Sequence, residues 1–371
     1  MEGSAMKKNL LYGILFLLML SFVTSCDETI HFYPEPQSSL VILQLNVDRD
    51  PPTLYKRVVY DEKWQSSTEE LSGSDRAYTF PEDYLLRITI EIYRYYGDNS
   101  RTDIQDVDEY PTERRVLLLP SDAQMPQDTI HAYLPDGKYK ALAFADYVPM
   151  DKASDWHYLT TDLRDITTNL NTYPRNPHLR SAAAGSASFS MTHQLTEGGY
   201  PATEEAANTP VWDRVIPVNL MRAHGRIRIY SSDWRQCYEL QDDVSIKLLY
   251  KDYVTTGYSV WNEEPSDYIT SYGYITRPPL GDYDPLFDSR LMVEDYLFAP
   301  SDREMIVHAV LISYDKYGNV IKTTPDIVIP IRRNQTTTIY APNFTVGRDD
   351  DDGDAGLSVD ESFDDEVVII I

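Results

Sequence analysis

The sequence predicts an all-β protein built from two tandem antiparallel β-sandwich domains. Several segments alternate between apolar and polar residues with the period of two that is typical of strands, most clearly residues 86–92. No apolar pattern with helical spacing extends beyond about two turns. The chain has 371 residues, which suits two domains at roughly 150 residues per domain. Closely spaced strands with almost no helix indicate packed β-sheets.

The first sandwich is expected over residues 38–195. Its predicted strands share the alternating pattern and cover residues 43–47, 86–92, 116–119, 129–134, 138–147 and 186–192. Pro135-Asp136-Gly137 is a tight-turn tripeptide, so the two segments beside it are expected to form a hairpin. Residues 162–170 are expected to form a short helix.

The second sandwich is expected over residues 211–348, after a linker at residues 196–210 that is mostly polar or small. Its predicted strands cover residues 215–221, 225–230, 244–250, 305–314, 320–322, 327–331 and 336–340. Residues 315–319 are expected to connect two of these strands as a hairpin loop. A second short helix is expected over residues 301–305.

The composition argues against nucleic acid as a partner. The chain holds 33 Lys+Arg against 59 Asp+Glu, for a formal net charge of -26. Nucleic-acid binding depends on basic side chains that neutralise phosphates, which this balance does not favour. The hydrophobic content of 42% is enough for a sizeable core, which argues against a wholly disordered chain.

The N-terminus predicts a lipoprotein signal peptide over residues 1–25. Lys7 and Lys8 precede a short apolar run, and the segment ends in Val23-Thr24-Ser25-Cys26. Small residues before a single cysteine resemble a bacterial lipobox, in which the chain is cleaved before the cysteine and its thiol is lipidated. We therefore expect lipid on Cys26, followed by a tether at residues 26–37. The alternative is an ordinary signal peptide that contains a cysteine.

A lipid on Cys26 would anchor the folded chain to the outer membrane of a Gram-negative cell without spanning it. The next residues, Asp27 and Glu28, resemble the surface-export signal of lipoproteins in some Gram-negative anaerobes. This resemblance implies surface exposure, and an acidic tether is the equal alternative.

The last 23 residues, 349–371, combine an acidic segment with an apolar end. Residues 349–366 hold ten acidic side chains and no basic one, and the chain then ends in Val367, Val368, Ile369, Ile370 and Ile371. Such a β-forming run needs a partner that buries it. The favoured interpretation is the last strand of its own domain. The alternative is a strand exchanged with another subunit.

The sequence predicts neither catalysis nor a metal or cofactor. The seven histidines lack the spacing of metal ligands, and no nucleophile elbow, phosphate loop or dinucleotide fingerprint occurs. The acidic run cannot be an EF-hand, because Gly353 at its sixth position would put Arg348 first and Val359 twelfth. A surface hydrolase is therefore the least favoured function.

Clustered aromatic residues leave a glycan partner open. Tyr258, Trp261, Tyr268, Tyr272 and Tyr274 fall in a stretch that is expected to be rich in loops. Such rings can stack on sugars, which makes a surface glycan-binding lipoprotein the alternative function. The favoured interpretation is that they cover a loop against the sandwich.

Four segments together resemble the fimbrillin-associated anchor and accessory lipoproteins of type V pili. They are the lipobox, an early strand at residues 38–47, residues 217–229, and an apolar strand followed by Arg333-Asn334 and a Thr-rich strand at residues 329–340. The resemblance implies transthyretin-like sandwiches, surface display, other pilus subunits as partners and no catalysis. Arg333-Asn334 would be a tight connection between strands.

In that family, polymerising subunits lose an N-terminal strand to an Arg-specific protease, and a neighbour's strand fills the groove. Arg49 follows the early strand here, and Arg57 is a second candidate for cleavage. Acidic flanks and nearby prolines make Arg49 a mediocre site. Because anchor subunits keep their lipid and stay uncut, the resemblance favours an anchor or accessory subunit that assembles by β-strand exchange.

Overall fold

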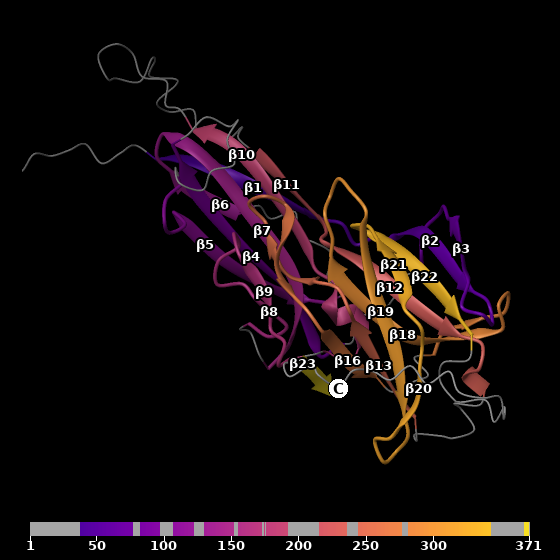
Figure 1. Ribbon diagram of the computed structural model, residues 1–371. Helices are drawn as coiled ribbons and strands as arrows, with labels where there is room; N and C mark the ends of the chain where they lie inside the picture. The colour runs from indigo at the N-terminus through magenta and orange to yellow at the C-terminus, as the bar shows by residue number, and fades with distance from the viewer. Residues whose placement is uncertain are drawn as a thin grey trace, which may run out of the picture.

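The structure is a computed structural model that describes residues 38–76, 82–96, 107–121, 130–151, 155–172, 174, 176–191, 215–235, 244–276, 281–342 and 367–370. The described residues form β-sheets together with a short 3-10 helix, η2 (Pro177–Arg180). The all-β prediction is therefore confirmed. Figure 1 shows an elongated molecule in which β1 and β4 to β7 lie toward one end, and β2, β3 and β17 to β22 lie toward the other.

A seven-stranded sheet builds the first end, in the order β5-β4-β7-β10-β11-β1-β6. Its strands are β1 (Ser39–Val47), β4 (Tyr84–Tyr95), β5 (Glu113–Pro120), β6 (Ile130–Leu134), β7 (Gly137–Pro149), β10 (Ala183–Met191) and β11 (Val215–Arg222). Buried residues of β1, β6 and β4 share one apolar cluster although these strands lie toward opposite edges of the sheet. The sheet therefore folds over itself and encloses its own core.

The predicted hairpin around Pro135-Asp136-Gly137 is wrong. β6 pairs with β1, whereas β7 pairs with β4 and β10. The turn instead carries the chain from one layer of the folded sheet to the other. A tight-turn sequence is the same in both cases, so it cannot show whether the two strands beside it pair with each other.

Two further sheets form the sandwich at the other end. The second sheet has the order β17-β18-β12-β22-β2-β3 and comprises β2 (Thr53–Tyr60), β3 (Ser66–Glu70), β12 (His224–Ser231), β17 (Tyr283–Asp284), β18 (Ser289–Phe298) and β22 (Gln335–Ala341). The third sheet has the order β20-β19-β13-β16-β23, with β21 also paired to β19. It comprises β13 (Ser245–Tyr250), β16 (Tyr272–Thr276), β19 (Met305–Tyr314), β20 (Val320–Thr323), β21 (Ile327–Ile331) and β23 (Val367–Ile370).

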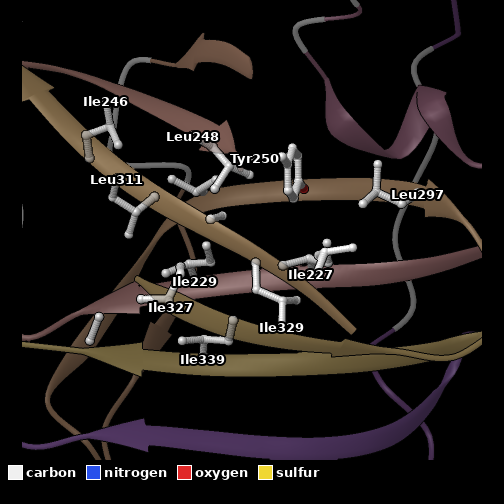
Figure 2. Packing of buried hydrophobic residues seen from close by; sticks show 14 of the residues in the cluster. Ile227, Ile229, Ile246, Leu248, Tyr250, Leu297, Leu311, Ile327, Ile329 and Ile339 are labelled. Carbon is white, nitrogen blue, oxygen red and sulfur yellow. The ribbon is translucent and has the colours of Figure 1, made fainter. Parts of the chain in front are cut away.

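The core of this sandwich lies between the second and third sheets (Figure 2). Ile227 and Ile339 of the second sheet are fully buried, as are Ile246 and Leu311 of the third. Apolar residues recur at every second position in these strands, because one face of each strand points toward this core. The predicted loop at residues 315–319 does connect a hairpin, β19 to β20.

A small fourth sheet joins the two ends of the molecule. It has the order β15-β14-β9-β8 and comprises β8 (Tyr158–Leu159), β9 (Ile166–Thr168), β14 (Val254–Ser259) and β15 (Glu264–Ile269). Beside it, Phe144 of β7 and Phe298 of β18 belong to one buried cluster. The two halves thus share an apolar core.

Both predicted helices are wrong. Residues 162–170 contain β9, and the described chain before β19 contains bends at residues 301–303. Both segments mix polar residues with a few apolar ones, which is compatible with a short helix. In the first segment, however, pairing of β9 with β14 keeps the backbone extended.

Strands cross between the two halves of the chain. β2 lies in a different sheet from β1 and pairs in parallel with β22, whereas β11 pairs in parallel with β1. In Figure 1 the indigo strands β2 and β3 lie beside the yellow strand β22. The predicted linker at residues 196–210 and the acidic segment at residues 349–366 lie outside the described residues.

Candidate strand-exchange site

β1 lies inside the first sheet and not at its edge. It pairs antiparallel with β6 and in parallel with β11. Its alternate residues Val41 and Leu43 are fully buried, and Leu45 is nearly so. Because the strand supplies core side chains and lies between two neighbours, its removal would open an apolar groove between β6 and β11. Such a groove is what an incoming strand fills in strand exchange.

The linker between β1 and β2 carries the first candidate cleavage site. Asp48, Arg49 and Asp50 lead out of β1, and two prolines precede β2 in the other sandwich. Arg49 is exposed, and its Nη1 lies 3.5 Å from the carbonyl oxygen of Ser121. The structure therefore presents Arg49 to solvent at the point where the chain passes between the two sandwiches.

Residues from distant segments hold this linker in place. Nδ2 of Asn334 donates to Oδ2 of Asp48 at 3.2 Å, and the Asn334 carbonyl accepts from the backbone N–H of Thr53 at 3.2 Å. Arg222, which is buried, donates to Oδ1 of Asn334 at 2.6 Å and to the Asp50 carbonyl at 3.2 Å. We call Asp48, Arg222 and Asn334 the linker clamp.

The backbone of Asn334 explains why an asparagine can occupy this position. Its φ is 56°, in the left-handed region that asparagine tolerates better than most residues. The turn that contains it connects β21 in the third sheet with β22 in the second. The expected tight connection at Arg333-Asn334 is thus present, and it also holds the linker.

Arg57, the second candidate cleavage site, lies in a different environment. It belongs to β2 and is paired on one side with Thr338 of β22 and on the other with Glu69 of β3. Its Nη1 lies 3.1 Å from Oε2 of Glu69, and its guanidinium lies over the ring of Phe287. A protease binds its substrate as an extended free segment, so pairing on both sides protects this bond.

The C-terminal strand is paired within the chain. Val367–Ile370 form β23, which pairs in parallel with Tyr272–Ile275 of β16 at the edge of the third sheet. The remaining predicted member of this run, Ile371, lies outside the described residues, as does Cys26.

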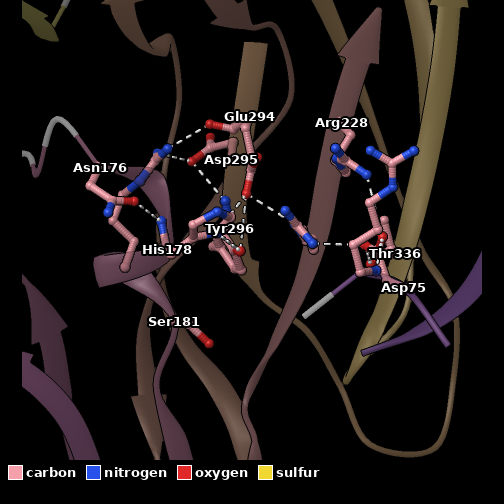
Figure 3. A network of polar contacts seen from close by, with 12 residues as sticks. Asp75, Asn176, His178, Ser181, Arg228, Glu294, Asp295, Tyr296 and Thr336 are labelled. Atoms are coloured by element: carbon pink, nitrogen blue, oxygen red, sulfur yellow. Dashed lines mark hydrogen bonds and ion pairs between the residues drawn. The ribbon is translucent and has the colours of Figure 1, made fainter. Parts of the chain in front are cut away.

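A buried ionic network connects the two halves, as Figure 3 shows. Arg180 of η2 forms an ion pair with Asp295 of β18 and donates to the Glu294 carbonyl at 2.5 Å. Arg226 of β12 in turn pairs with Glu294 at 2.9 Å and with Asp75 at 2.7 Å. All five side chains are buried, and charges this deep require partners.

The electrostatics of the network follow from its pairing. Burial alone would raise the pKa of Glu294, but the hydrogen bond from His178 and the charge of Arg226 hold that pKa well below its usual range. The sequence analysis missed this network. The available signal was charge inside strands that are otherwise apolar: Arg226 in β12, and Glu294 with Asp295 in β18.

Two buried histidines belong to the interior and not to a reactive site. Burial lowers the pKa of His157 to about 3 and lowers that of His224 well below its usual value. The Tyr158 hydroxyl donates to the Arg180 carbonyl at 2.5 Å, so it accepts from Nε2 of His224 at 3.0 Å. Nδ1 of His224 then accepts from the backbone N–H of Ala182 at 3.4 Å, as a neutral imidazole can.

The aromatic cluster is mostly internal. Tyr258, Tyr272 and Tyr274 are buried, Trp261 is 8% exposed, and Tyr268 alone of the five is exposed, at 53%. The stretch expected to be rich in loops is in fact the strands β14, β15 and β16. Four of the five rings are therefore unavailable for stacking on a sugar.

The described part of the chain offers no cluster of metal-binding side chains. Within it, no group of three or more His, Cys, Asp or Glu side chains is arranged to hold a metal ion. No helix among the same residues is long and apolar enough to cross a membrane. Cys237 lies outside the described residues.

The fold defines a β-sandwich protein of two parts. Each part contains strands from both halves of the chain, because β1 pairs with β11 and β2 pairs with β22. Residues 47–371 match the model of DUF6562, a family of unknown function, and the chain belongs to that family. No curated protein is detectably similar in sequence.

Several solved structures show a distant likeness. A proposed adhesin from Bacteroides ovatus is 12% identical with a TM-score of 0.38, and 77% of each chain is covered. A proposed cell adhesion protein from Parabacteroides distasonis is also 12% identical, with a TM-score of 0.37 over 84% of this chain and 91% of that one. The fimbrial anchor protein Mfa2 from Porphyromonas gingivalis is 11% identical, with a TM-score of 0.33 over 77% and 82%. Likenesses this weak transfer no function.

Proposed function

We propose that the protein is a non-catalytic, lipid-anchored surface subunit that anchors or caps a pilus-like assembly by β-strand exchange. One observation carries the exchange: β23 is a short apolar strand at a sheet edge, paired on one side with β16. It follows residues 349–366, whose acidic composition favours solvation over burial. An edge strand at the end of the chain can leave β16 and add to a neighbour's sheet, or a neighbour's strand can take its place.

The opposite end of the folded chain supports an anchor over a stalk subunit. β1 is held on both sides, and the linker after it is held by the linker clamp. These contacts oppose the extended conformation that cleavage at Arg49 requires. The chain thus keeps β1 and, with it, the connection to the lipid on Cys26. The resemblance of the sequence to pilus anchor lipoproteins points the same way.

Deletion of Val367–Ile371 tests the exchange. The deleted chain should keep its thermal unfolding midpoint to within a few degrees, because β23 covers only an edge, but it should no longer co-purify with the pilus fraction sheared from its native host. A matched control replaces the five residues with Ser and Gly, which keeps the length and removes the apolar side chains. Assembly that is unchanged in both variants would exclude exchange through this strand.

Mass spectrometry of the protein extracted from membranes of the native host tests the anchor. A lipidated chain from Cys26 to Ile371 is the expected product. A lipid-free chain that begins at Asp50 or Val58 would show cleavage after Arg49 or Arg57. That result would make the protein a polymerising subunit that loses its first strand.

A further inference from the structure

The outer surface of β6, β1 and β11 is free of formal charge. The side chains on this side of the three strands alternate with buried ones. None of them is Asp, Glu, Lys or Arg, although charged residues make up 25% of the chain. We call this surface the uncharged face; its members are Leu40, Ile42, Gln44, Asn46, His131, Tyr133, Val215, Pro217, Asn219 and Met221.

The uncharged face changes in character along the strands. Where β1 begins, Leu40 lies opposite Tyr133 on one side, and Ile42 lies opposite Val215 on the other. Tyr133 is 69% exposed and Val215 is 44% exposed. Where β1 ends, the face is polar, since Nδ2 of Asn46 donates to Oδ1 of Asn219 at 2.9 Å. The apolar end therefore lies at the start of β1.

The start of β1 is also where the chain leads back to Cys26. Twelve residues separate Cys26 from Ser39, the first residue of β1. A chain of that length reaches at most about 45 Å. A lipid on Cys26 would therefore keep the apolar end of the face close to the bilayer, at a high effective concentration.

We propose that the uncharged face is a membrane-seating surface, whose apolar end rests on the membrane leaflet that holds the Cys26 lipid. The inference rests on the proposed lipid anchor. Tyr133 suits this position, because tyrosine prefers the boundary between lipid and water. The lack of charge matters too: a chain with a net charge of -26 can approach an anionic leaflet best through a face without carboxylates.

A fluorescent probe at two positions tests the seating. The full chain with its own signal peptide is produced with Cys237→Ser, lipidated, and labelled with an environment-sensitive fluorophore at Tyr133→Cys or Tyr317→Cys. Tyr317 is 78% exposed in the β19–β20 turn, at the opposite end of the molecule in Figure 1. Both proteins are reconstituted in vesicles of phosphatidylethanolamine and phosphatidylglycerol that contain nitroxide-labelled lipid. The probe at residue 133 should shift to the blue and be quenched, and the probe at residue 317 should do neither.

Two charge substitutions on one strand provide the matched control. Val215→Asp places a carboxylate at the apolar end of the face, whereas Met221→Asp places one six residues away on the same side of β11, about 20 Å along the strand. The two native side chains are similarly exposed, at 44% and 49%. Val215→Asp should abolish the quenching at residue 133, and Met221→Asp should preserve it.

The outcomes separate this inference from the proposed function. A lipidated chain that sediments with the vesicles while its probe at residue 133 stays in water overturns the seating and leaves the anchor intact. Equal loss of quenching in Val215→Asp and Met221→Asp also overturns it. A chain that carries no lipid and does not sediment overturns the anchor itself.

Discussion

Asn334 shows how one residue in a tight turn can hold a segment far away in the sequence. Its side chain contacts Asp48, 286 residues earlier, and it also accepts from Arg222. The sequence indicated the turn, because Arg333-Asn334 falls between two predicted strands. It could not indicate the partner, because a hydrogen bond between distant segments leaves no local pattern.

Asn334→Gly should make Arg49 more accessible to an Arg-specific protease. Glycine accepts the φ of 56° without strain, so the substitution removes the two side-chain contacts of the linker clamp and little else. The loss of these hydrogen bonds should lower the free energy of unfolding by about 1–2 kcal/mol. N-terminal sequencing should find Asp50 sooner than in the parent protein. Arg49→Lys in the same background should stay intact, and an unchanged cleavage rate in Asn334→Gly would refute the clamp.

His157 should make the protein sensitive to mild acid. Its pKa is about 3 in the folded state against about 6.5 when unfolded, so below pH 6.5 the unfolded chain binds more protons. Stability should therefore fall as the pH falls from 6.5 toward 3, by roughly 2 kcal/mol at pH 5 for this histidine. Denaturant titrations at pH 7.5 and pH 5 measure the loss. His157→Gln should show a smaller loss between the two; an equal loss would assign the effect to other groups.

At the scale of elements, alternation was a good guide. Turn signals were less consistent, because residues 315–319 and Arg333-Asn334 connect strands as expected, whereas Pro135-Asp136-Gly137 does not form the expected hairpin. The strand predicted over residues 86–92 falls within β4. Its apolar residues alternate with polar ones because every second side chain belongs to the same buried core cluster. The strands β14 to β16 were not predicted, because Tyr258 and Tyr272 were assigned to an aromatic loop. β2 and β3 were not predicted either, since the β3 side chains are exposed and carry no alternation.

Gly185→Ala should disrupt the junction of β10 with β11. A Cβ at Gly185 would lie 2.0 Å from the carbonyl oxygen of Asn219, and backbone cannot yield as a side chain can. We expect a loss of about 1–3 kcal/mol or more in the free energy of unfolding, measured by urea titration. Ser186→Ala, the next residue in β10, is the control and should have a much smaller effect. Comparable losses in both variants would show that the close approach is not the cause.

At the scale of the whole molecule, the sequence predicted two sandwiches in tandem. The observed strand order shows in addition that strands from the two halves of the chain pair with each other. Length and strand count were enough to expect two packed units. They could not show that β2 pairs with β22 or that β11 pairs with β1, since parallel pairing between distant strands has no signature in either strand. The buried ionic network and the shared apolar core connect the two units further.

Arg180→Met should destabilise both halves together. The substitution leaves the buried carboxylate of Asp295 without its guanidinium partner, although the Tyr250 hydroxyl still donates to it at 2.8 Å. The expected cost is about 3–5 kcal/mol, with a single unfolding transition in calorimetry. The exposed pair of Arg235 with Asp288 supplies the control, because Arg235→Met should leave the midpoint unchanged. Two separate transitions in the parent protein would contradict the coupling.

The pairing of β2 with β22 has a consequence for the order in which the chain can fold. The two strands are separated by 274 residues, from 61 to 334, so β2 and β3 have no sheet to join until Gln335–Ala341 is available. In a chain that crosses a membrane N-terminus first, these strands would stay unpaired during the crossing, and their edges could pair with wrong partners. If the chain is exported as proposed, β2 and β3 therefore stay unpaired with β22 until the last tenth of the chain has crossed the membrane.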